Sequence, residues 1–336
     1  MSITVCMPSY NSGTTALKNI LWMQERLPKS VEYVVVDDGS TEDVAPYLSL
    51  QLNPRVRFIR HATNGGFVSG FSSALLAVEH GVAVICSDED VIPPEGIKAL
   101  KQLDWRTTAV ARGSVGSMDG YTSPDENPVQ QPVHAKRGAA AVSAFGFDNM
   151  YISGTAYNME LLRQVLDTYR ANSWKHVIYA HLYLDLLAAA AGDVQLLTQT
   201  TALAGPTGKR AVEPSQYNTV YSLGNRIDQL IVFRDALLDA CNVGGTFDSA
   251  MFDVGYHKLM ARMLFLIGRV NGRQYYDARI DPIGCMHAAA ATMIASLVMV
   301  PEVQSVLPYI KHDLDRILRP QDAVVTEGAG ERDTAA

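Results

Sequence analysis

Short apolar runs rich in β-branched residues alternate with longer amphipathic segments through the first hundred residues of the chain. Four of these runs are predicted to be buried strands, at residues 3–7, 31–36, 56–60 and 82–85. The segments 15–26 and 70–79 between them show the helical spacing of apolar residues. Because strands and helices alternate at this spacing, the pattern predicts an α/β fold with a doubly wound, mostly parallel sheet and helices on both faces.

The pattern changes in the second half of the chain. A closing strand is predicted at 194–197, and from residue 216 onward the apolar residues follow helical spacing. This change predicts three regions, which are an α/β domain at 1–215, a helical C-terminal extension at 216–320 and a flexible polar tail at 321–336. The apolar helices of the extension favour either packing against the sheet or self-association into a homo-oligomer.

Acidic or glycine-containing turns follow three of the predicted strands. These turns are Asp37-Asp38-Gly39-Ser40-Thr41, Asn64-Gly65-Gly66-Phe67 and Ser87-Asp88-Glu89-Asp90. The carboxyl ends of parallel strands meet at one edge of a sheet, where open α/β sheets bind their ligands. Asp88 and Asp90 are suited to hold a hard divalent cation together with phosphate oxygens. The alternative is an acidic turn that caps the helix beginning near Glu95.

Composition and charge narrow the class of function. The hydrophobic content of 48% and the charged content of 19% are typical of a packed globular protein. A net charge of −7 without a long basic run disfavours a nucleic-acid partner. The four cysteines show no CxxC spacing, which indicates reduced thiols and a cytoplasmic location. The apolar stretch 285–300 is shorter than the roughly 20 residues of a spanning helix, so no transmembrane span is predicted, with peripheral membrane contact as the minority alternative.

Four sequence blocks in the first hundred residues resemble the N-terminal half of family 2 glycosyltransferases of the GT-A fold. The blocks are Pro8-Ser9-Tyr10-Asn11, Val35-Val36-Asp37-Asp38-Gly39-Ser40-Thr41, Asn64-x-Gly66-Phe67 and Asp88-x-Asp90. The last block matches the DxD motif of that family, which binds a divalent metal. The resemblance therefore implies that the α/β domain binds a nucleotide-sugar and is catalytic.

The resemblance also assigns roles to individual residues. It implies that Pro8, Tyr10 and Asp38 surround the base and ribose, with Asn64 and Gly66 in the same nucleotide-sugar site. It further implies that Asp90 binds the metal directly, as Mn²⁺ or Mg²⁺, and that Asp88 lies near the ribose or the metal. In a GT-A enzyme a loop after the closing strand can fold over the diphosphate, and here that loop contains Lys209 and Arg210. A surface pair is the equal alternative for these two residues.

The chain departs from the family pattern where the general base is expected. Residues 150–157 resemble the strand before the acceptor-side helix, which is predicted at 160–169. The family then carries a Glu-Asp pair about eleven residues before a glycine, and counting back from Gly192 places His181 at the position of the Asp. His181 and Asp185 lie four residues apart, on one face of a predicted helix and within hydrogen-bonding reach. We expect His181 to be the base with Asp185 as its orienting partner; Asp185 alone and a structural pair are the alternatives.

These features predict a metal-dependent, inverting glycosyltransferase that moves a sugar from a nucleotide-diphosphate sugar to an acceptor hydroxyl. A UDP- or dTDP-sugar is the expected donor, and the acceptor is unknown. A sugar nucleotidyltransferase is one alternative, although residues 9–15 lack the basic side chains that such an enzyme needs for a triphosphate. The second alternative is a nucleotide-sugar-binding module with weakened catalysis, because the Glu-Asp pair is missing.

Overall fold

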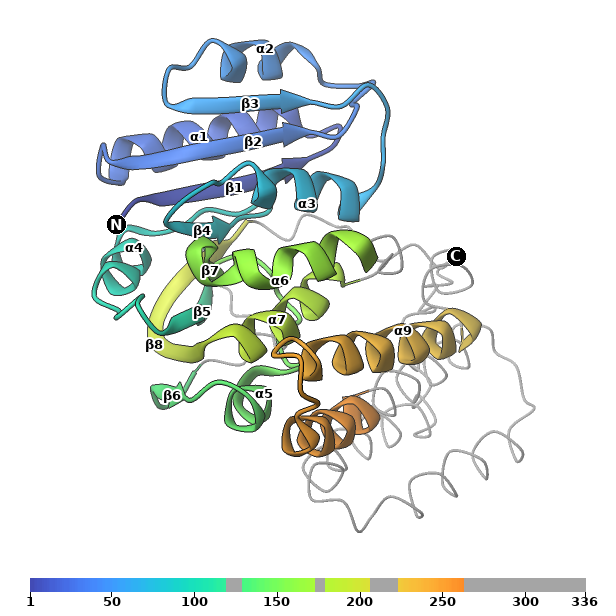
Figure 1. The fold of residues 1–336 in the computed structure, drawn as a ribbon. Helices are drawn as coiled ribbons and strands as arrows, with labels where there is room; N and C mark the ends of the chain where they lie inside the picture. Colours follow the sequence, from blue (N-terminus) through green and yellow to red (C-terminus); the bar gives the residue numbers. More distant parts are fainter. Residues whose placement is uncertain (119–128, 173–178, 206–222, 263–336) are drawn as a thin grey trace, which may run out of the picture. The chain divides into compact units, whose positions relative to one another are not determined.

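The computed structural model describes residues 1–118, 129–172, 179–205 and 223–262. Within them, an eight-stranded sheet has the order β3-β2-β1-β4-β7-β5-β8-β6 (Figure 1). The strands are β1 (Ile3–Ser9), β2 (Val31–Asp37), β3 (Val56–Arg60), β4 (Val82–Ile85), β5 (Thr108–Ser117), β6 (Val133–Ala135), β7 (Ala156–Asn158) and β8 (Asp193–Ala204). Only β6 and β7 run antiparallel to their neighbours. The predicted mostly parallel α/β sheet is confirmed.

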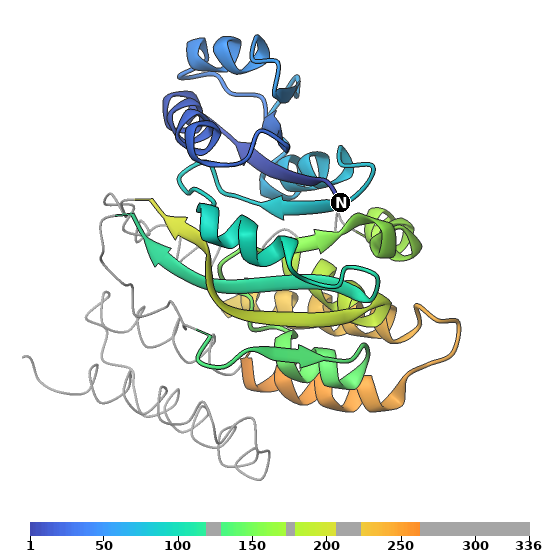
Figure 2. The same cartoon turned by 90° about the vertical axis from the view of Figure 1, so that its left-hand side faces the viewer.

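Helices cover both faces of this sheet. They are α1 (Gly13–Arg26), α2 (Ala45–Gln51), α3 (Phe67–Leu76), α4 (Pro94–Lys101), α5 (Ala139–Phe145), α6 (Met159–Asn172), α7 (Ala180–Ala191) and α9 (Leu223–Cys241), and residues 249–262 are also helical. Alternate strand residues point to opposite faces, so Val5 and Met7 of β1 pack into one core with Ile20 of α1. Helix α4 packs against β8, as Figure 2 shows.

Burial on both faces explains why the central strands are apolar at successive positions. Every residue of β4 is buried, and in β2 only Glu32 is exposed. A parallel sheet covered by helices on both sides requires such continuous apolar runs. The four strands predicted from the first hundred residues are therefore present, and each lies within two residues of its predicted bounds.

The strand predicted at 150–157 is much shorter than expected. Strand β7 begins only at Ala156, because a turn at Ser153 and Gly154 interrupts the extended backbone before it. Gly154 has a φ of 84°, a conformation that residues with a Cβ rarely adopt. The residues before β7 therefore form a loop, and this loop carries side chains to the rim of the sheet.

The helices after β8 divide between two units. Residues 1–211 and 228–259 form one compact unit, and the rest of the chain forms the second. Within the first unit, Tyr183 of α7 donates its hydroxyl to Asp239 of α9 at 3.0 Å, and the rings of Phe147 and Phe233 lie 5.8 Å apart. The predicted boundary at residue 215 falls outside the described residues, so the three-region division stays a prediction.

Candidate active site

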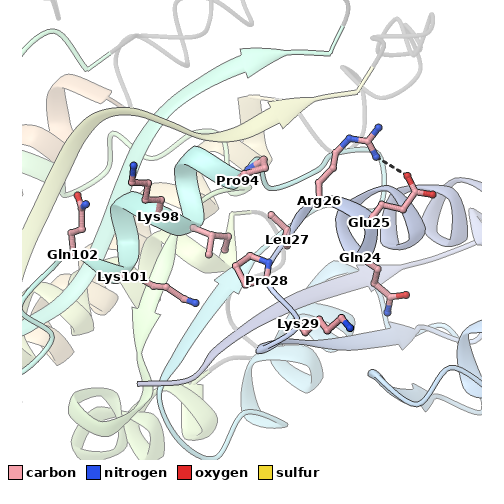
Figure 3. A pocket seen from close by; sticks show the side chains of 11 residues that line it. Gln24, Glu25, Arg26, Leu27, Pro28, Lys29, Pro94, Lys98, Lys101 and Gln102 are labelled. Atoms are coloured by element: carbon pink, nitrogen blue, oxygen red, sulfur yellow. Dashed lines mark hydrogen bonds and ion pairs between the residues drawn. The ribbon is translucent and has the colours of Figure 1, made fainter.

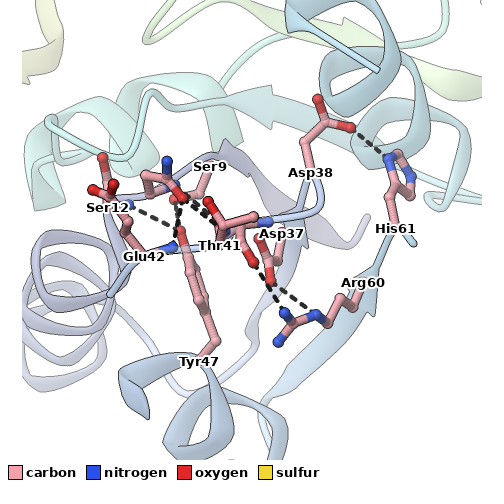
Figure 4. A network of polar contacts seen from close by, with 11 residues as sticks. Ser9, Ser12, Asp37, Asp38, Thr41, Glu42, Tyr47, Arg60 and His61 are labelled. Carbon is pink, nitrogen blue, oxygen red and sulfur yellow. Dashed lines mark hydrogen bonds and ion pairs between the residues drawn. The ribbon is translucent and has the colours of Figure 1, made fainter. Parts of the chain in front are cut away.

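The strands β1, β2 and β4 bring the acidic turns to one rim of the sheet. The parallel register places Ser9, the last residue of β1, beside Asp37 at the end of β2, and β1 also pairs in parallel with β4. The Ser9 hydroxyl donates to Asp88 Oδ2 at 2.7 Å and lies 2.6 Å from the Tyr47 hydroxyl of α2. Figure 4 shows this network around Ser9 and Tyr47. A buried serine thus connects β1, the turn after β4 and α2.

Asp37, the first acid after β2, has a structural role. Its side chain is fully buried, and its Oδ1 accepts the backbone N–H of Ser40 at 2.9 Å. Arg60 Nε lies 3.4 Å from Oδ2 as an ion pair, at a distance and angle that do not make a hydrogen bond. Asp37 therefore fixes the turn that positions the second acid, Asp38.

Asp38 lies at the rim and is held from two sides. Its Oδ1 is 2.6 Å from His61 Nδ1 (Figure 4). The backbone N–H of Gly65 points between its two oxygens, at 3.3 and 3.2 Å. Only 4% of the residue is exposed. The sequence predicted Asp38 at the nucleotide site but did not indicate the histidine that contacts it.

The turn after β2 passes so close to the chain after β3 that it requires a glycine at position 39. Gly39 has a φ of 71°, and a Cβ there would overlap the backbone of Thr63 and Asn64. We expect Gly39→Ala to lower the free energy of unfolding by roughly 2 kcal/mol or more, because strain in φ and a backbone clash add. Gly66→Ala is the matched control, since Gly66 has a φ of 80° but open space around a Cβ. Urea denaturation that finds the two variants equal would contradict the clash.

Asp90 connects three segments that are far apart in the sequence. Its Oδ1 accepts the Tyr151 hydroxyl at 2.8 Å and the Gly205 N–H at 3.0 Å, and its Oδ2 accepts the Ser153 hydroxyl at 2.6 Å. The residue is 3% exposed, and burial raises the pKa of its carboxyl against the lowering effect of these donors. Asp90 therefore holds the loop before β7 and the end of β8 against the turn after β4.

The two carboxylates after β4 suit a cation that substrate phosphates also hold. Within the described residues, no group of three or more His, Cys, Asp or Glu side chains forms a complete metal cage. Mg²⁺ and similar hard cations are usually bound by one or two carboxylates with phosphate oxygens and water, not by a cage of protein ligands alone. Asp88 and Asp90 match that donor set.

The other predicted nucleotide-site residues lie around the same turns. Tyr10 follows β1 and is 41% exposed, so its ring is available at the rim, and Pro8 is half-buried within the strand. Asn64 and Gly66 are exposed, and Asn64 Oδ1 accepts the Gly66 N–H at 2.7 Å to close their turn. Lys209 and Arg210 lie outside the described residues, so their predicted contact with the diphosphate stays a prediction.

The direct hydrogen bond predicted between His181 and Asp185 is wrong, because Asn149 lies between them. His181 Nε2 donates to the Asn149 carbonyl oxygen at 2.7 Å, while the Asn149 amide donates to Asp185 Oδ2 at 3.0 Å. Tyr157 donates its hydroxyl to Asp185 Oδ1 at 2.6 Å. His181 Nδ1 is buried and has no hydrogen-bond partner among the described residues. The residue that orients His181 is therefore Asn149, which the sequence analysis did not select.

Burial shifts the pKa values of the two candidate bases in opposite directions. It lowers the pKa of the His181 imidazole to about 4, although the hydrogen bond to Asn149 opposes the shift. It raises the pKa of the Asp185 carboxyl to about 7, against the bonds from Tyr157 and Asn149. At neutral pH His181 is uncharged, and because Nε2 carries the proton, Nδ1 keeps a lone pair that can accept one.

An aromatic contact joins His181 to the predicted nucleotide-binding turn. Phe67 directly follows Gly66, is 43% exposed, and meets the His181 ring edge-on with centroids 6.4 Å apart. Tyr179 meets the same imidazole edge-on at 5.9 Å. His181 thus lies behind two rings at the border between α3 and α7, and one of these rings belongs to the rim.

A second concave surface lies away from these residues. A groove of about 720 Å³ separates the C-terminal half of α1 from α4 and is lined by Arg26, Lys29, Lys98 and Lys101 among others (Figure 3). It contains none of the predicted site residues, and its residues 24–29 lead into the amino end of β2, opposite the rim. We therefore place the candidate active site at the strand tips and not in this groove.

An α/β sheet of this strand order, with acidic turns at the carboxyl ends of β2 and β4, has the architecture of the GT-A class of glycosyltransferases. Residues 4–166 match the family Glycosyl transferase family 2, so this half of the chain is a family 2 glycosyltransferase domain. The family resemblance predicted from the four sequence blocks is confirmed.

Known proteins support the fold at low sequence identity. Residues 1–349 of S. aureus TarS match with a TM-score of 0.58, and the same segment in complex with UDP-GlcNAc matches with 0.60; each is 15% identical and covers 94% of this chain and 88% of that chain. An uncharacterized protein of Mycobacterium tuberculosis is 28% identical over 100 residues. That match spans 30% of this chain and 31% of the relative. In the described part of this chain, no helix has the length and apolar character to cross a bilayer.

Proposed function

We propose that the protein transfers a sugar from a UDP- or dTDP-sugar to an acceptor hydroxyl, with a divalent cation and with inversion of the anomeric carbon. The observation that carries the proposal is the rim of the family 2 domain, where Asp38 and the Ser9–Asp88 pair lie at adjacent strand ends. S. aureus TarS, which shares the fold, has a structure with UDP-GlcNAc, so a uridine nucleotide is the first donor to test.

The nucleobase of the nucleotide-sugar donor would lie between Tyr10 and Asp38. A uracil or thymine ring has an imide N–H that needs an acceptor, and the Asp38 carboxylate accepts only. The exposed Tyr10 ring can stack on the base. Pro8, Asn64 and Gly66 would complete the wall of the nucleotide site at the ends of β1 and β3.

Asp88 and Asp90 would hold the cation, as Mn²⁺ or Mg²⁺, together with the diphosphate oxygens. The cation neutralises the negative charge that develops on the diphosphate when the bond to the sugar breaks. Lys209 and Arg210 would contact the same diphosphate from the segment after β8. Because Asp90 accepts the N–H of Gly205, it also fixes the point from which that segment departs.

His181 would act as the general base. Its Nδ1 lone pair accepts the proton of the acceptor hydroxyl while Asn149 holds the Nε2–H. The acceptor oxygen then attacks the anomeric carbon from the side opposite the leaving diphosphate, which inverts the configuration. Asp185 is the alternative base; burial raises its pKa to about 7, but both of its oxygens already accept hydrogen bonds, from Tyr157 and Asn149.

Location and assembly follow from weaker indications. We propose a cytoplasmic location, with peripheral membrane contact as the alternative, and no nucleic-acid partner, because the net charge is −7. Self-association through the C-terminal helices stays a prediction, and residues 263–320 of that extension lie outside the described ranges.

Donor hydrolysis tests the proposed function directly. We expect purified protein with MnCl₂ to release free UDP or dTDP slowly from one member of a panel of nucleotide-sugars, because transferases of this kind hydrolyse their donor without an acceptor. A sugar nucleotidyltransferase would instead consume a sugar phosphate and a nucleoside triphosphate and release pyrophosphate. Nucleotide binding without any release from the panel would favour the weakened binding module.

A further inference from the structure

His61 connects the rim carboxylate to two serines of α3. Its Nδ1 lies 2.6 Å from Asp38 Oδ1 and 3.3 Å from the Ser69 hydroxyl, and its Nε2 lies 2.9 Å from the Ser73 hydroxyl. The backbone N–H of His61 donates to the Asp37 carbonyl oxygen at 2.9 Å, which fixes the chain beside the turn after β2. The His61 side chain is only 21% exposed.

The partners determine which nitrogen of the neutral imidazole carries the proton. An ionised carboxylate can only accept, so Nδ1 donates to Asp38 and Nε2 accepts the Ser73 hydroxyl. The carboxylate thus selects the tautomer, and the serine hydroxyl, which can donate or accept, donates to Nε2 and holds the ring in place. The Gly65 N–H is shared between the two Asp38 oxygens. Asp38 Oδ1 therefore also accepts the short bond from His61, whereas Oδ2 accepts only the longer, shared bond from Gly65.

The order Asp–His–Ser is also that of a hydrolytic triad, but the surroundings do not support nucleophilic catalysis. Such chemistry needs free N–H donors beside the nucleophile to stabilise an oxyanion. Ser73 lies inside α3, where backbone N–H groups bond to carbonyls of the preceding turn. The chain of contacts therefore orients Asp38 and does not activate Ser73.

We propose that His61, fixed by Ser73, is a positioning residue that aims Asp38 Oδ2 at the imide N–H of the donor base and so sets base specificity. This inference rests on the proposed function. Without the imidazole, Asp38 keeps only the longer Gly65 contacts and can rotate away from the base. Partners that orient metal ligands contribute about 10–100-fold to metal affinity, and we expect an effect at the lower end of that scale for the partner of Asp38.

Cytosine supplies a probe that separates positioning from general stability. Its ring nitrogen N3 carries no hydrogen, so Asp38 gains nothing from CDP that it gains from UDP. A site built to bond a donor rejects the analogue that lacks it, because its own polar group is left unpaired. If the Asp38 carboxylate is no longer held in the correct orientation, the affinity for UDP therefore falls selectively. Damage to the fold would instead lower the affinities for both UDP and CDP.

The experiment measures UDP, dTDP and CDP affinity by calorimetry in the presence of MnCl₂. We expect wild type to bind UDP or dTDP more tightly than CDP. In His61→Ala the affinity for UDP or dTDP should fall roughly tenfold, while the affinity for CDP stays constant. His61→Asn should restore most of the affinity for UDP or dTDP, since its amide nitrogen takes the place of Nδ1, and Ser73→Ala should lose part of it. His80→Ala, at an exposed histidine, is the matched control.

Three outcomes would overturn the inference. An unchanged UDP-to-CDP ratio in His61→Ala would show that Asp38 needs no such partner. Equal loss of both nucleotides in His61→Ala and His61→Asn would assign His61 to the fold alone. Hydrolysis of an activated ester that disappears in Ser73→Ala would assign the chain of contacts to nucleophilic chemistry. Wild-type protein that binds none of the three nucleotides would instead contradict the proposed function, and this inference with it.

Discussion

Asp90→Ala is expected to reduce sugar transfer by more than about a hundredfold, the scale of losing a group that stabilises developing charge. The substitution removes a carboxylate proposed to hold the cation, and it also leaves Tyr151, Ser153 and the Gly205 N–H without their acceptor. Each buried donor left unpaired costs about 1–3 kcal/mol, so the variant should also unfold at a lower urea concentration. Steady-state transfer and urea denaturation measure the two effects.

Two control variants separate the chemistry from the fold. Asp90→Asn keeps an acceptor oxygen of the same shape but loses the charge, so transfer should fall while much of the stability remains. Glu89→Gln changes the neighbouring exposed acid and should leave both properties near wild type. Wild-type transfer should disappear with EDTA and return with MnCl₂. Full turnover in Asp90→Asn, or in wild type with EDTA, would remove the cation from the proposed mechanism.

The sheet could be predicted because its signals are local. The run Val31–Val36 is apolar at nearly every position, as a strand buried on both faces requires, and it became β2. The short helices α2 and α5 were missed, because seven residues make about two turns, too few to show the helical spacing of apolar residues. Strand β6 has three residues, too few for any periodicity to appear.

Candidate site residues could be predicted where they directly follow a strand. They could not be predicted where they only contact another candidate residue that is distant in the sequence. Asp38 and Asp88 follow apolar runs, so their place at the rim follows from the topology. His61 and Asn149 each contact a predicted residue across 23 or more positions of sequence, and nothing in the local pattern indicates such pairs. The helical spacing of His181 and Asp185 correctly put them on one helix but could not indicate that Asn149 would occupy the space between them.

Arg112 is a buried charged residue whose role could likewise not be predicted from the local sequence. Its Nε is buried without a hydrogen-bond partner among the described residues, and burial lowers its pKa although Asp185 opposes the shift. In sequence it is one polar residue within the strand β5. Its positive charge contributes to the low pKa of His181, so the electrostatics of the candidate base depend on a residue that no motif marks.

The pH dependence of transfer should distinguish His181 from Asp185 as the base. A base works only when unprotonated, so kcat/KM rises as the pH increases through its pKa. With His181 as the base, the acidic limb should lie near its pKa of about 4, and transfer should be flat from pH 6 to 8. With Asp185 as the base, the limb should lie near its pKa of about 7, so transfer at pH 6 should be about a tenth of its plateau value.

Variants of the two residues complete this test, because general-base catalysis contributes about 10²–10⁴-fold. His181→Ala should lose transfer on that scale at every pH, while UDP affinity, set at the strand tips, remains. Asp185→Asn retains an acceptor for Tyr157 or Asn149 and should keep both transfer and the limb near pH 4. If Asp185→Asn instead abolishes transfer and His181→Ala spares it, the base is the carboxylate, and the unpartnered Nδ1 of His181 has another role. Only the neutral imidazole combines an available lone pair with contact to the rim through Phe67, which is why we expect the first result.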